Sequence, residues 1–307
     1  MSDKSLKKSL ENLGIIILNF NNVKDTIACI ESIWNIIGDL GETIIVVDNG
    51  SSNNEADVLQ SRFGEGIVLL KSEKNYGYAR GNNIGLCYAQ EIGLKYLCIL
   101  NNDTIVRKNF FTDLILYVDE HPDTAFVSPA ILGLDGKAQS TGGFVKLYKG
   151  TPFYYNNQKN YEEIKDKEIV CDILVGACML FKTSIIQEIG LIPEAYFLFY
   201  EETEWCYKAK KAGKKCVCLT SHFILHSGSV SVKKTGGLQE YLMERNRVVF
   251  CKRNASLPMF LIFLAYDTAR TLYQGIVEKE PMFRYLRYHL DGLLGTIDKR
   301  FPFIWIN

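Results

Sequence analysis

Residues 96–106, YLCILNNDTIV, place an apolar run directly before two amides and a carboxylate, Asn101, Asn102 and Asp103. The apolar run is typical of a buried strand, so the three polar residues mark its carboxyl end. Asn and Asp are common in tight turns, because they tolerate left-handed backbone and hydrogen-bond to their own main chain. Open α/β sheets, however, bind their ligands beyond the carboxyl ends of strands. The stretch therefore predicts either a turn or a metal-binding ledge.

The sequence around this stretch alternates between short apolar runs and helical patterns. The predicted strands are residues 13–20, 41–49, 66–72 and 95–103, and the predicted helices between them are residues 22–37, 53–63 and 78–93. Such alternation indicates a parallel sheet with helices on both faces, and strands that are apolar throughout fit burial on both sides. We therefore predict an α/β fold with a Rossmann-like, mostly parallel central sheet.

Three polar clusters follow predicted strands, namely residues 19–22 (NFNN), 48–52 (DNGSS) and 101–103 (NND). Because the carboxyl ends of parallel strands share one edge of a sheet, the clusters should converge there. A simple turn explains Asn49 and Gly50 taken alone. It does not explain why Asp48 and Asp103 each follow an apolar run directly, so this edge is the predicted functional site.

Composition and motifs exclude several classes of protein. Lys and Arg together number 35, as do Asp and Glu, so no global charge favours nucleic acid as a partner. Residues 75–86, NYGYARGNNIGL, fit neither a P-loop nor the dinucleotide-binding fingerprint. The N-terminus carries no signal-peptide pattern, and no apolar run approaches the roughly 20 residues that span a bilayer. With nine scattered cysteines, we expect a cytoplasmic protein with reduced thiols and no thiolate metal site at Cys216 and Cys218.

Beyond about residue 130 the pattern changes. Residues 140–157 indicate a hairpin and loop, and residues 168–190 a strand, a turn at Gly176, a second strand and a helix that begins at Thr183 or Ser184. Residues 259–266, MFLIFLAY, fit a buried helix. The apolar stripe in residues 280–297 favours a helix packed on the catalytic domain or on a second subunit, with an interfacial, membrane-contacting helix as the alternative. That stripe comprises Phe283, Leu286, Leu290, Leu293, Leu294 and Ile297.

The acidic sequence EETE begins at Glu201 and is surrounded by aromatic residues. Acidic residues in a first helical turn are common, because they complement the helix dipole, and we predict a helix that runs to Lys211 and ends at Gly213. An aromatic setting raises the pKa of a carboxyl group while the dipole lowers it, which is typical of a general base. A plain helix start and a catalytic site both remain open on this pattern.

The ordered motifs resemble the inverting nucleotide-sugar glycosyltransferases of family 2, and most closely the rhamnosyltransferase-like, non-processive members with the GT-A fold. The resemblance covers residues 13–253. It rests on eight motifs in order: IIILNFNN, IIVVDNGSSN, NYGYARGNNIG, ILNNDTIV, VGACMLFKTS, FLFYEETEWCYKAKKAG, HSGSVS and ERNRVVF. It implies a catalytic domain in residues 1–253, with a nucleotide-binding half (13–130) and an acceptor half (131–253), and a helical extension in residues 254–307.

The resemblance also assigns roles to residues. It implies that NND is a reduced DxD motif in which Asp103 binds Mn²⁺ or Mg²⁺, with His226 as a second ligand. It also implies a glutamate general base, for which Glu202 is the first candidate, Glu201 the second and Glu204 the third. Asn101 and Asn102 depart from a full DxD and leave one carboxylate for the metal. The implied nucleotide-sugar contacts are Asn19, Asn21, Asp48, Asn75, Gly81, Asn82, Asn102 and Arg245.

We therefore expect transfer of one sugar from a UDP- or dTDP-linked donor to a glycan, lipid-linked or protein-linked acceptor. The enzyme is expected to be cytoplasmic, with contact to the inner face of a membrane and a homodimer as further possibilities. A sugar nucleotidyltransferase is one alternative, but residues 19–26, NFNNVKDT, lack its glycine-rich basic loop. A catalytically silent binding module is the other, favoured by the reduced NND and disfavoured by the intact acidic cluster.

Overall fold

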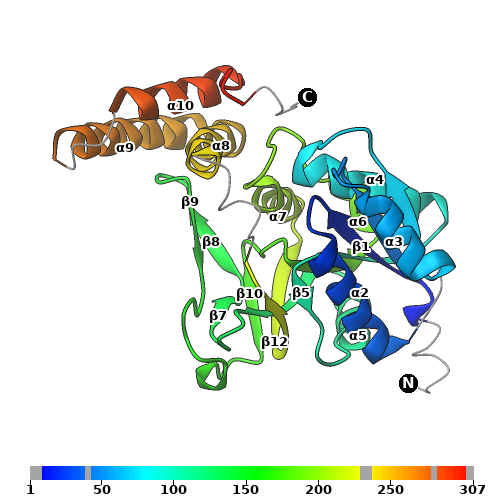
Figure 1. The fold of residues 1–307 in the computed structure, drawn as a ribbon. Helices are drawn as coiled ribbons and strands as arrows, with labels where there is room; N and C mark the ends of the chain where they lie inside the picture. Colours follow the sequence, from blue (N-terminus) through cyan, green and yellow to red (C-terminus); the bar gives the residue numbers. More distant parts are fainter. Residues whose placement is uncertain (1–8, 39–42, 229–236, 278–281, 302–307) are drawn as a thin grey trace.

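The computed structural model describes residues 9–38, 43–228, 237–277 and 282–301. The start of the predicted strand 41–49, the last residues of HSGSVS, residues 280–281 of the predicted stripe and residues 302–307 lie outside these ranges. A central sheet is flanked by helices, and a helical layer lies at one edge of the molecule (Figure 1). The predicted fold class is therefore confirmed.

The four strands predicted in the first third of the chain occur, as do the hairpin and the two strands predicted in residues 140–190, whereas the strands over residues 124–132 and 215–226 were not predicted. Their bounds are β1 (Leu13–Asn19), β2 (Ile44–Asp48), β3 (Val68–Lys71), β4 (Tyr96–Asn101), β5 (Thr104–Ile105), β6 (Thr124–Leu132), β7 (Ala138–Ser140), β8 (Gly143–Lys146), β9 (Thr151–Tyr154), β10 (Glu168–Cys171), β11 (Cys178–Lys182) and β12 (Lys215–His226). The main sheet has the order β10-β12-β6-β11-β4-β1-β2-β3, while β8 and β9 pair separately as a hairpin.

The register of the central strands brings the polar clusters to one edge. Strand β1 is parallel to both β2 and β4, with Asn19 opposite Asp48 and Leu18 opposite Asn101. Strand β11 runs antiparallel between β4 and β6 and thereby joins the second half of the chain to the first. The three clusters therefore end neighbouring strands, as predicted.

Helices cover both faces of the sheet. Their bounds are α2 (Val23–Ile37), α3 (Glu55–Phe63), α4 (Gly77–Glu91), α5 (Phe111–Glu120), α6 (Ser184–Ile189), α7 (Glu201–Lys211), α8 (Leu238–Asn254), α9 (Leu257–Ile276) and α10 (Met282–Leu294). Successive strand side chains point to opposite faces, so β1 sends Ile16 into a core with α4, α6 and α7, and Ile15 and Ile17 into a second core with α2, α3 and α5. Burial on both faces explains the unbroken apolar runs.

Helices α8, α9 and α10 pack together (Figure 1), so from here on the helical extension includes α8, which the sequence analysis places in the catalytic domain. The prediction that residues 259–266 are buried is wrong, because the helix exists but Leu261 and Ile262 are exposed. The stripe in residues 280–297 packs on this chain only through Leu293 and Ile297 among its described members, and its packing on a second subunit stays a prediction. Helix α10 buries Tyr285, Tyr288 and His289, which lie on its other face. Four stripe residues are exposed, namely Phe283, Leu286, Leu290 and Leu294.

Among the described residues, no helix is both long and apolar enough to cross a membrane. All nine cysteines lie within the described ranges, and none of them forms a disulfide. Eight of them are buried and Cys87 is half-buried, which agrees with the predicted buried thiols.

Candidate active site

Asn19, at the end of β1, is the centre of a buried hydrogen-bond network. Its amide nitrogen donates to Asp48 Oδ1 at 2.8 Å and to Glu55 Oε2 at 3.0 Å, and its amide oxygen accepts from the Thr26 hydroxyl at 2.7 Å. Asn102 donates to the same hydroxyl at 2.9 Å. Asn19 itself is fully buried, so it orients the Asp48 carboxylate, which lies nearer to the surface.

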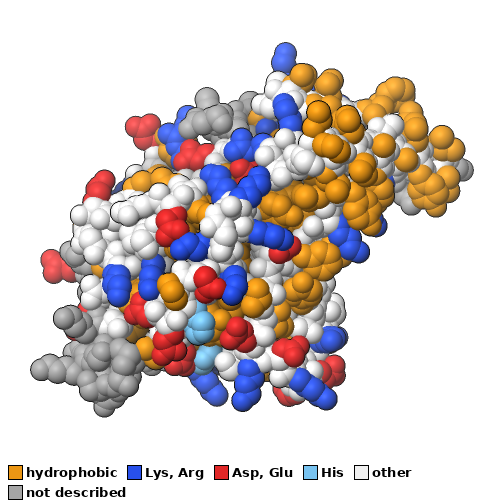
Figure 2. All heavy atoms as spheres, turned by 180° about the vertical axis from the view of Figure 1, so that it is seen from behind, with side chains coloured by type: hydrophobic (Ala, Val, Ile, Leu, Met, Phe, Trp, Pro, Cys, Tyr) orange, Lys and Arg blue, Asp and Glu red, His pale blue; other side chains and the backbone are white. Residues whose placement is uncertain are grey.

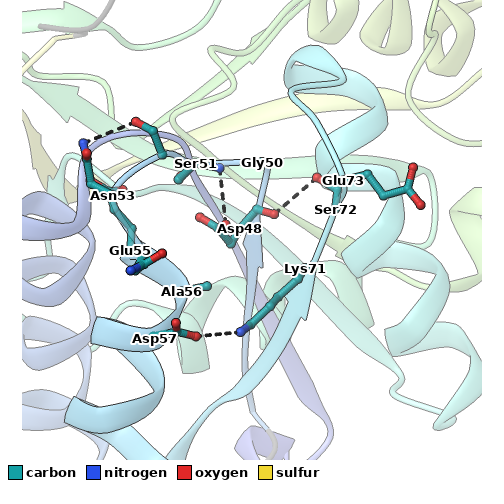
Figure 3. A pocket seen from close by; sticks show the side chains of 12 residues that line it. Asp48, Gly50, Ser51, Asn53, Glu55, Ala56, Asp57, Lys71, Ser72 and Glu73 are labelled. Atoms are coloured by element: carbon teal, nitrogen blue, oxygen red, sulfur yellow. Dashed lines mark hydrogen bonds and ion pairs between the residues drawn. The ribbon is translucent and has the colours of Figure 1, made fainter.

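A cavity of about 360 Å³ opens beside this network and is lined by the loop that follows β2, the start of α3 and the end of β3 (Figure 3). The loop is fixed from the β1 side, because Asn21 accepts from the Ser52 backbone and hydroxyl, each at 2.8 Å. Asp48 and Glu55 lie on the cavity wall, and Lys71, the lysine on that wall, pairs with Asp57 at 2.9 Å. This lining suits hydrogen-bond donors of a ligand better than a phosphate.

The start of α4 lies against this edge. Asn49 is buried and donates to Asn75 Oδ1 at 3.0 Å and to the Gly77 carbonyl at 3.1 Å, so it links the β2 loop to the helix. Gly77 has a φ of +81°, and a Cβ there would lie 2.2 Å from the Phe197 carbonyl oxygen. Only glycine fits such a backbone approach, which brings α4 against the segment that leads to α7.

Gly81 and Asn82, both predicted to contact the donor, are buried on α4. A Cβ on Gly81 would lie 2.5 Å from Leu18, so Gly81 allows α4 to pack tightly on β1. Asn82 donates to the Tyr78 carbonyl at 2.9 Å, while its own amide oxygen has no hydrogen-bond partner among the described residues. A buried amide oxygen without a partner is costly, so it is a candidate ligand contact.

The two predicted metal ligands are neighbours. His226, at the end of β12, has its Nε2 3.2 Å from Asp103 Oδ1, and the Asn101 amide nitrogen lies 3.4 Å from the same Nε2. Strand β5 pairs with β12 so that Thr104 lies opposite His226, and this pairing holds the two segments together. Asp103 also accepts from the Ser227 hydroxyl at 3.3 Å.

Gln139, which the sequence analysis does not single out, fixes the His226 ring. Its amide nitrogen donates to the His226 carbonyl at 2.9 Å, so its amide oxygen must face Nδ1, at 2.7 Å. Nδ1 then carries a proton, and Nε2 is the ring nitrogen that faces the Asp103 carboxylate. With Nε2 unprotonated, the imidazole and the carboxylate would be two acceptors that face each other, an arrangement that a cation between them stabilises. Carboxylate and imidazole are both ligands of divalent metals, so the pair fits such an ion.

The segment before α7 has a strained backbone. Phe199 and Tyr200 have φ angles of 71° and 76°, in the left-handed region that bulky residues avoid. Asn246 of α8 donates to the Leu198 and Phe199 carbonyls at 2.8 and 3.0 Å, and the Tyr200 hydroxyl donates to the Gly150 carbonyl at 2.9 Å. Strain that neighbouring elements maintain in this way is common at functional sites.

This segment presents Glu201 and Glu202 at the start of α7. Burial raises the pKa of Glu202 to about 7, against the opposing effect of backbone N–H groups at the helix start. Burial, and then the charge of Glu202, hold the pKa of Glu201 well above its usual range. Glu201 is fully buried, and its Oε2 has no hydrogen-bond partner among the described residues. Glu202 is partly exposed, so it can meet a ligand.

Glu204, the third candidate base, has a structural environment. Arg253 binds both of its oxygens at 2.8 to 3.0 Å, and Tyr196 and Asn254 also donate to it. Burial alone would raise its pKa, but the hydrogen bonds from Arg253 and Tyr196 hold the pKa of Glu204 below its usual value. A carboxylate occupied in this way is a poor proton acceptor for a substrate.

A continuous series of contacts joins the acidic helix to the strand ends. A Cβ on Gly176 would lie 3.5 Å from Glu202 Cγ, and the Tyr78 hydroxyl donates to the Gly176 carbonyl at 2.7 Å. The next residue, Ala177, accepts from the Asn101 backbone N–H at 2.9 Å. Asn101 in turn lies beside His226. The structure therefore brings Glu202, Asp103 and His226 into one region.

Arg245 does not join this group. It is 1% exposed, and its guanidinium donates to the Thr296 carbonyl at 3.0 Å and to Asn246 Oδ1 at 2.6 Å. Arg245 therefore ties α8 to the end of the helical extension. Asn246 and Arg247 are buried as well, so ERNR is neither a phosphate-facing nor a solvated helix face.

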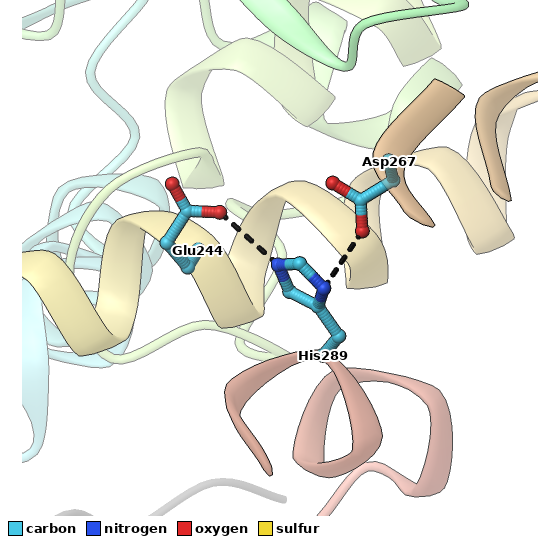
Figure 4. Close-up of side chains that lie close together, drawn as sticks. All are labelled: Glu244, Asp267 and His289. Carbon is cyan, nitrogen blue, oxygen red and sulfur yellow. Dashed lines mark hydrogen bonds and ion pairs between the residues drawn. The ribbon is translucent and has the colours of Figure 1, made fainter. Parts of the chain in front are cut away.

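A second acidic group lies in the helical extension, where His289 Nδ1 is 2.8 Å from Asp267 and His289 Nε2 is 3.2 Å from Glu244 (Figure 4). The three side chains could offer ligands to a metal. Arg247 and Arg270, however, also pair with both carboxylates. Three cationic side chains already neutralise the two acids, so the group is an ion-pair network that holds α8, α9 and α10 together.

The profile of glycosyl transferase family 2 matches residues 14–190. The low-salt glycan biosynthesis hexosyltransferase Agl10 of Haloferax volcanii is 25% identical over 296 residues, which are 94% of this chain and 91% of that protein. The dTDP-rhamnosyl transferase RfbF of Shigella flexneri is 23% identical over 274 residues, 82% of this chain and 86% of that protein.

Two solved structures share the fold. TarS residues 1–349 of S. aureus, in complex with UDP-GlcNAc, align with a TM-score of 0.58 and 14% identity over 95% of this chain and 83% of that chain. GalNAc-T7 with UDP, GalNAc and Mn²⁺ aligns with a TM-score of 0.57 and 15% identity over 70% of this chain and 43% of that chain. The chain belongs to glycosyltransferase family 2 and has the GT-A fold.

Proposed function

We propose that this glycosyltransferase inverts the anomeric centre as it transfers one sugar from a UDP- or dTDP-linked donor, with Glu202 as the general base. The observation that carries the proposal is the state of Glu202. It is a partly exposed carboxyl group at the start of α7, with a pKa raised to about 7 and contacts that lead to Asp103 and His226. A base poised near neutral pH is what deprotonation of an acceptor hydroxyl requires.

The proposed reaction is a single displacement. The acceptor hydroxyl oxygen bonds to the anomeric carbon as the bond from that carbon to the donor's diphosphate oxygen breaks, and the hydroxyl proton passes to Glu202. The diphosphate leaves with the electron pair, so the configuration at the anomeric carbon inverts. Glu201 is fully buried, so it is less able than Glu202 to meet the acceptor hydroxyl.

The nucleoside is assigned to the cavity beside Asp48. Its wall carries Asp48 and Glu55, which accept hydrogen bonds, as the N–H of a uracil or thymine base and the ribose hydroxyls require. The acidic wall disfavours a phosphate at this position. The donors named for RfbF and TarS, a dTDP-sugar and a UDP-sugar, support a pyrimidine nucleotide.

Asp103 and His226 are assigned to the diphosphate end of the donor. A divalent cation, Mn²⁺ or Mg²⁺, held by these two residues would neutralise charge on the leaving diphosphate. Gln139 holds the His226 ring in the tautomer that such binding needs. The Mn²⁺ named in the GalNAc-T7 structure supports a metal in this fold.

The acceptor is assigned to the side of Glu202 that faces Tyr78, Tyr154 and Gly176. The charge of Glu202 raises the pKa of both tyrosines further, after the effect of burial, so both rings lie near its carboxyl group. Aromatic rings suit the apolar faces of sugars, and we propose a glycan, lipid-linked or protein-linked hydroxyl as the acceptor.

Donor hydrolysis tests the proposal, across UDP-, dTDP- and GDP-sugars with Mn²⁺, with Mg²⁺ and with EDTA. We expect one pyrimidine sugar nucleotide to be turned over only with metal. Glu202→Gln should abolish turnover and keep donor binding. The control is Glu188→Gln, since Glu188 lies on neighbouring α6 and is exposed.

Anomeric NMR of the product, once an acceptor is in hand, tests inversion directly. Retained configuration would exclude the single displacement. Full turnover by Glu202→Gln would exclude Glu202 as the base, and metal-independent turnover would exclude the role of Asp103 and His226.

A further inference from the structure

We propose that the outer surface of α9 and α10 docks on an anionic membrane. The surface, here called the docking face, is formed by the exposed apolar side chains of the two helices, which gather at the upper right of Figure 2. Its exposed side chains include Phe283 at 82%, Ile276 at 73% and Leu257 at 71%. An apolar face of this extent on a folded protein marks an interaction surface.

Helix α9 shows the pattern most clearly. It has 20 residues, so it is about 30 Å long, and none of its exposed residues is charged. Apart from Thr268, all of them are apolar or aromatic. The charged residues of α9, Asp267 and Arg270, both point inward into the ion-pair network. An ordinary surface helix has the opposite arrangement, with its polar side facing water.

The charges around the docking face identify the partner. Among the described residues 238–277 and 282–301, every charged residue of the exposed class is basic, and every Asp or Glu is buried or half-buried. Four of the acids accept ion pairs. The exposed basic residues are Lys252, Arg253, Arg287, Lys299 and Arg300, of which Arg253 pairs with Glu204, and Arg287 and Arg300 pair with Asp298. Each Lys or Arg near an anionic lipid surface contributes about 1 kcal/mol to binding.

A second copy of the chain fits these charges less well. Twofold dimers bury the same patch on both subunits, so a dimer formed through this face would bring one basic border against another. A lipid surface instead supplies anionic headgroups for the basic side chains and an apolar boundary for Phe283, Leu290 and Ile276. Tyr273, half exposed on α9, adds the amphipathic ring that such interfaces favour.

The docking face also lies beside the proposed acceptor side. The β8–β9 hairpin reaches α9 through its connecting turn, where Lys149 Nζ is 5.5 Å from the centre of the Tyr266 ring. The same hairpin carries Tyr154, which lies near enough to Glu202 that, after burial, the charge of Glu202 raises the pKa of Tyr154. A membrane on this face would therefore lie near the acceptor entrance. This link to a lipid-linked acceptor rests on the proposed function, whereas docking itself does not.

Cosedimentation of the full chain with vesicles tests the proposal. We expect binding to phosphatidylcholine vesicles that contain phosphatidylglycerol, weaker binding to pure phosphatidylcholine, and a loss of binding as salt is added. The variants Ile276→Glu and Phe283→Glu should each reduce partitioning by about tenfold or more, because a carboxylate at the lipid boundary is costly. Leu134→Glu, at an exposed apolar position far along the chain, should bind as the parent does.

Thermal unfolding and donor hydrolysis without vesicles should be unchanged in all three variants, since none of these side chains belongs to the site. Equal partitioning of Phe283→Glu, Ile276→Glu and the parent would overturn the proposal. So would absence of vesicle binding together with a dimer in sedimentation equilibrium that the same substitutions dissociate. Vesicle binding is measured without a sugar donor. Its outcome therefore does not depend on whether the proposed glycosyltransferase mechanism is correct.

Discussion

Two pairs of acidic side chains in this protein, Glu201 with Glu202 and Glu244 with Asp267, have opposite electrostatic states. At the start of α7, burial raises the pKa of both glutamates, and Glu201 Oε2 has no partner among the described residues. In the helical extension, hydrogen bonds from His289 and ion pairs with Arg247 and Arg270 outweigh burial, and the pKa of Glu244 and of Asp267 falls. Burial alone therefore does not make an acid a candidate general base, whereas burial without counter-charges does.

The largest expected effect is on catalysis at the first group. Glu202→Gln removes the proton acceptor while keeping the shape of the side chain, so we expect kcat to fall by about a thousandfold with little change in donor affinity. In the parent enzyme, kcat/KM should rise with pH through about 7, because the base must be ionised. Steady-state kinetics across pH measures both.

Glu201→Gln is the matched variant for this prediction. It alters the fully buried partner and should keep most of the activity. If Glu201→Gln were inactive and Glu202→Gln active, the base would be Glu201. The partly exposed position of Glu202 would then not indicate the base.

The next effect concerns stability at the second group. Asp267→Ala removes one of the two acceptors that Arg247 and His289 share and leaves the buried positive charge undercompensated, so we expect the free energy of unfolding to fall by about 3 kcal/mol. Urea unfolding measures the loss, and donor hydrolysis at low temperature should persist in the folded fraction. A loss below about 1 kcal/mol, typical of an exposed pair, would contradict a stabilising network.

Gln139 sharpens the comparison, because its hydrogen bonds serve the site rather than the fold. Gln139→Leu frees the His226 ring, so we expect Mn²⁺ affinity to fall by about tenfold. Electron paramagnetic resonance of bound Mn²⁺ in the presence of UDP measures affinity without turnover. Gln139→Glu keeps an acceptor for Nδ1–H and should recover most of it. Equal affinity in all three proteins would remove Gln139 from the site.

The smallest expected effect is the pH dependence of the network. Burial opposes the charged form of His289, but hydrogen bonds to Asp267 and Glu244 raise its pKa above the ordinary value of about 6.5. Its contribution to stability is therefore complete below about pH 6.5 and is lost as pH rises through the raised value. The two carboxylates act in the opposite sense, and their contribution is lost as pH falls through their lowered pKa values.

Unfolding midpoints from pH 5 to 9 measure this loss, with His289→Gln as the comparison. The parent should lose stability toward high pH relative to the variant. A parallel pH profile for the two proteins would show that His289 is neutral in the folded state.

Local patterns predicted the first half of the fold well, because strands buried on both faces need unbroken apolar runs. They also placed Asp48, Asp103 and Glu202 at the ends of elements, where open sheets bind ligands. A turn was expected at Asn49, but this residue is buried and hydrogen-bonds to Asn75 and Gly77. The pattern could not distinguish the two roles, because Asn is common in both. Gln139 gave no signal, because its role depends on a residue 87 positions away.

Apolar periodicity failed in the helical extension for a physical reason. The stripe containing Phe283 and Leu290 shows that one side of α10 is apolar, but not whether anything covers it. A better signal was present in α9, where Asp267 and Arg270 are the charged residues of the helix and lie three positions apart. Isolated charges on one side of an apolar helix indicate a paired, inward-facing side.

The contacts across residue 253 determine how the chain can be cut. A fragment ending there, at the expected boundary of the catalytic domain, would lack Asn254, which donates to Glu204, and Thr296, which accepts from Arg245. It would also expose the side of α8 that packs on α9 and α10. Asn246 of α8 holds the strained segment before Glu201 through hydrogen bonds to Leu198 and Phe199, so that segment would lose support as well. Expression of a shortened enzyme should therefore retain residues to at least 301, and chimeras with relatives should exchange α8 to α10 as one unit.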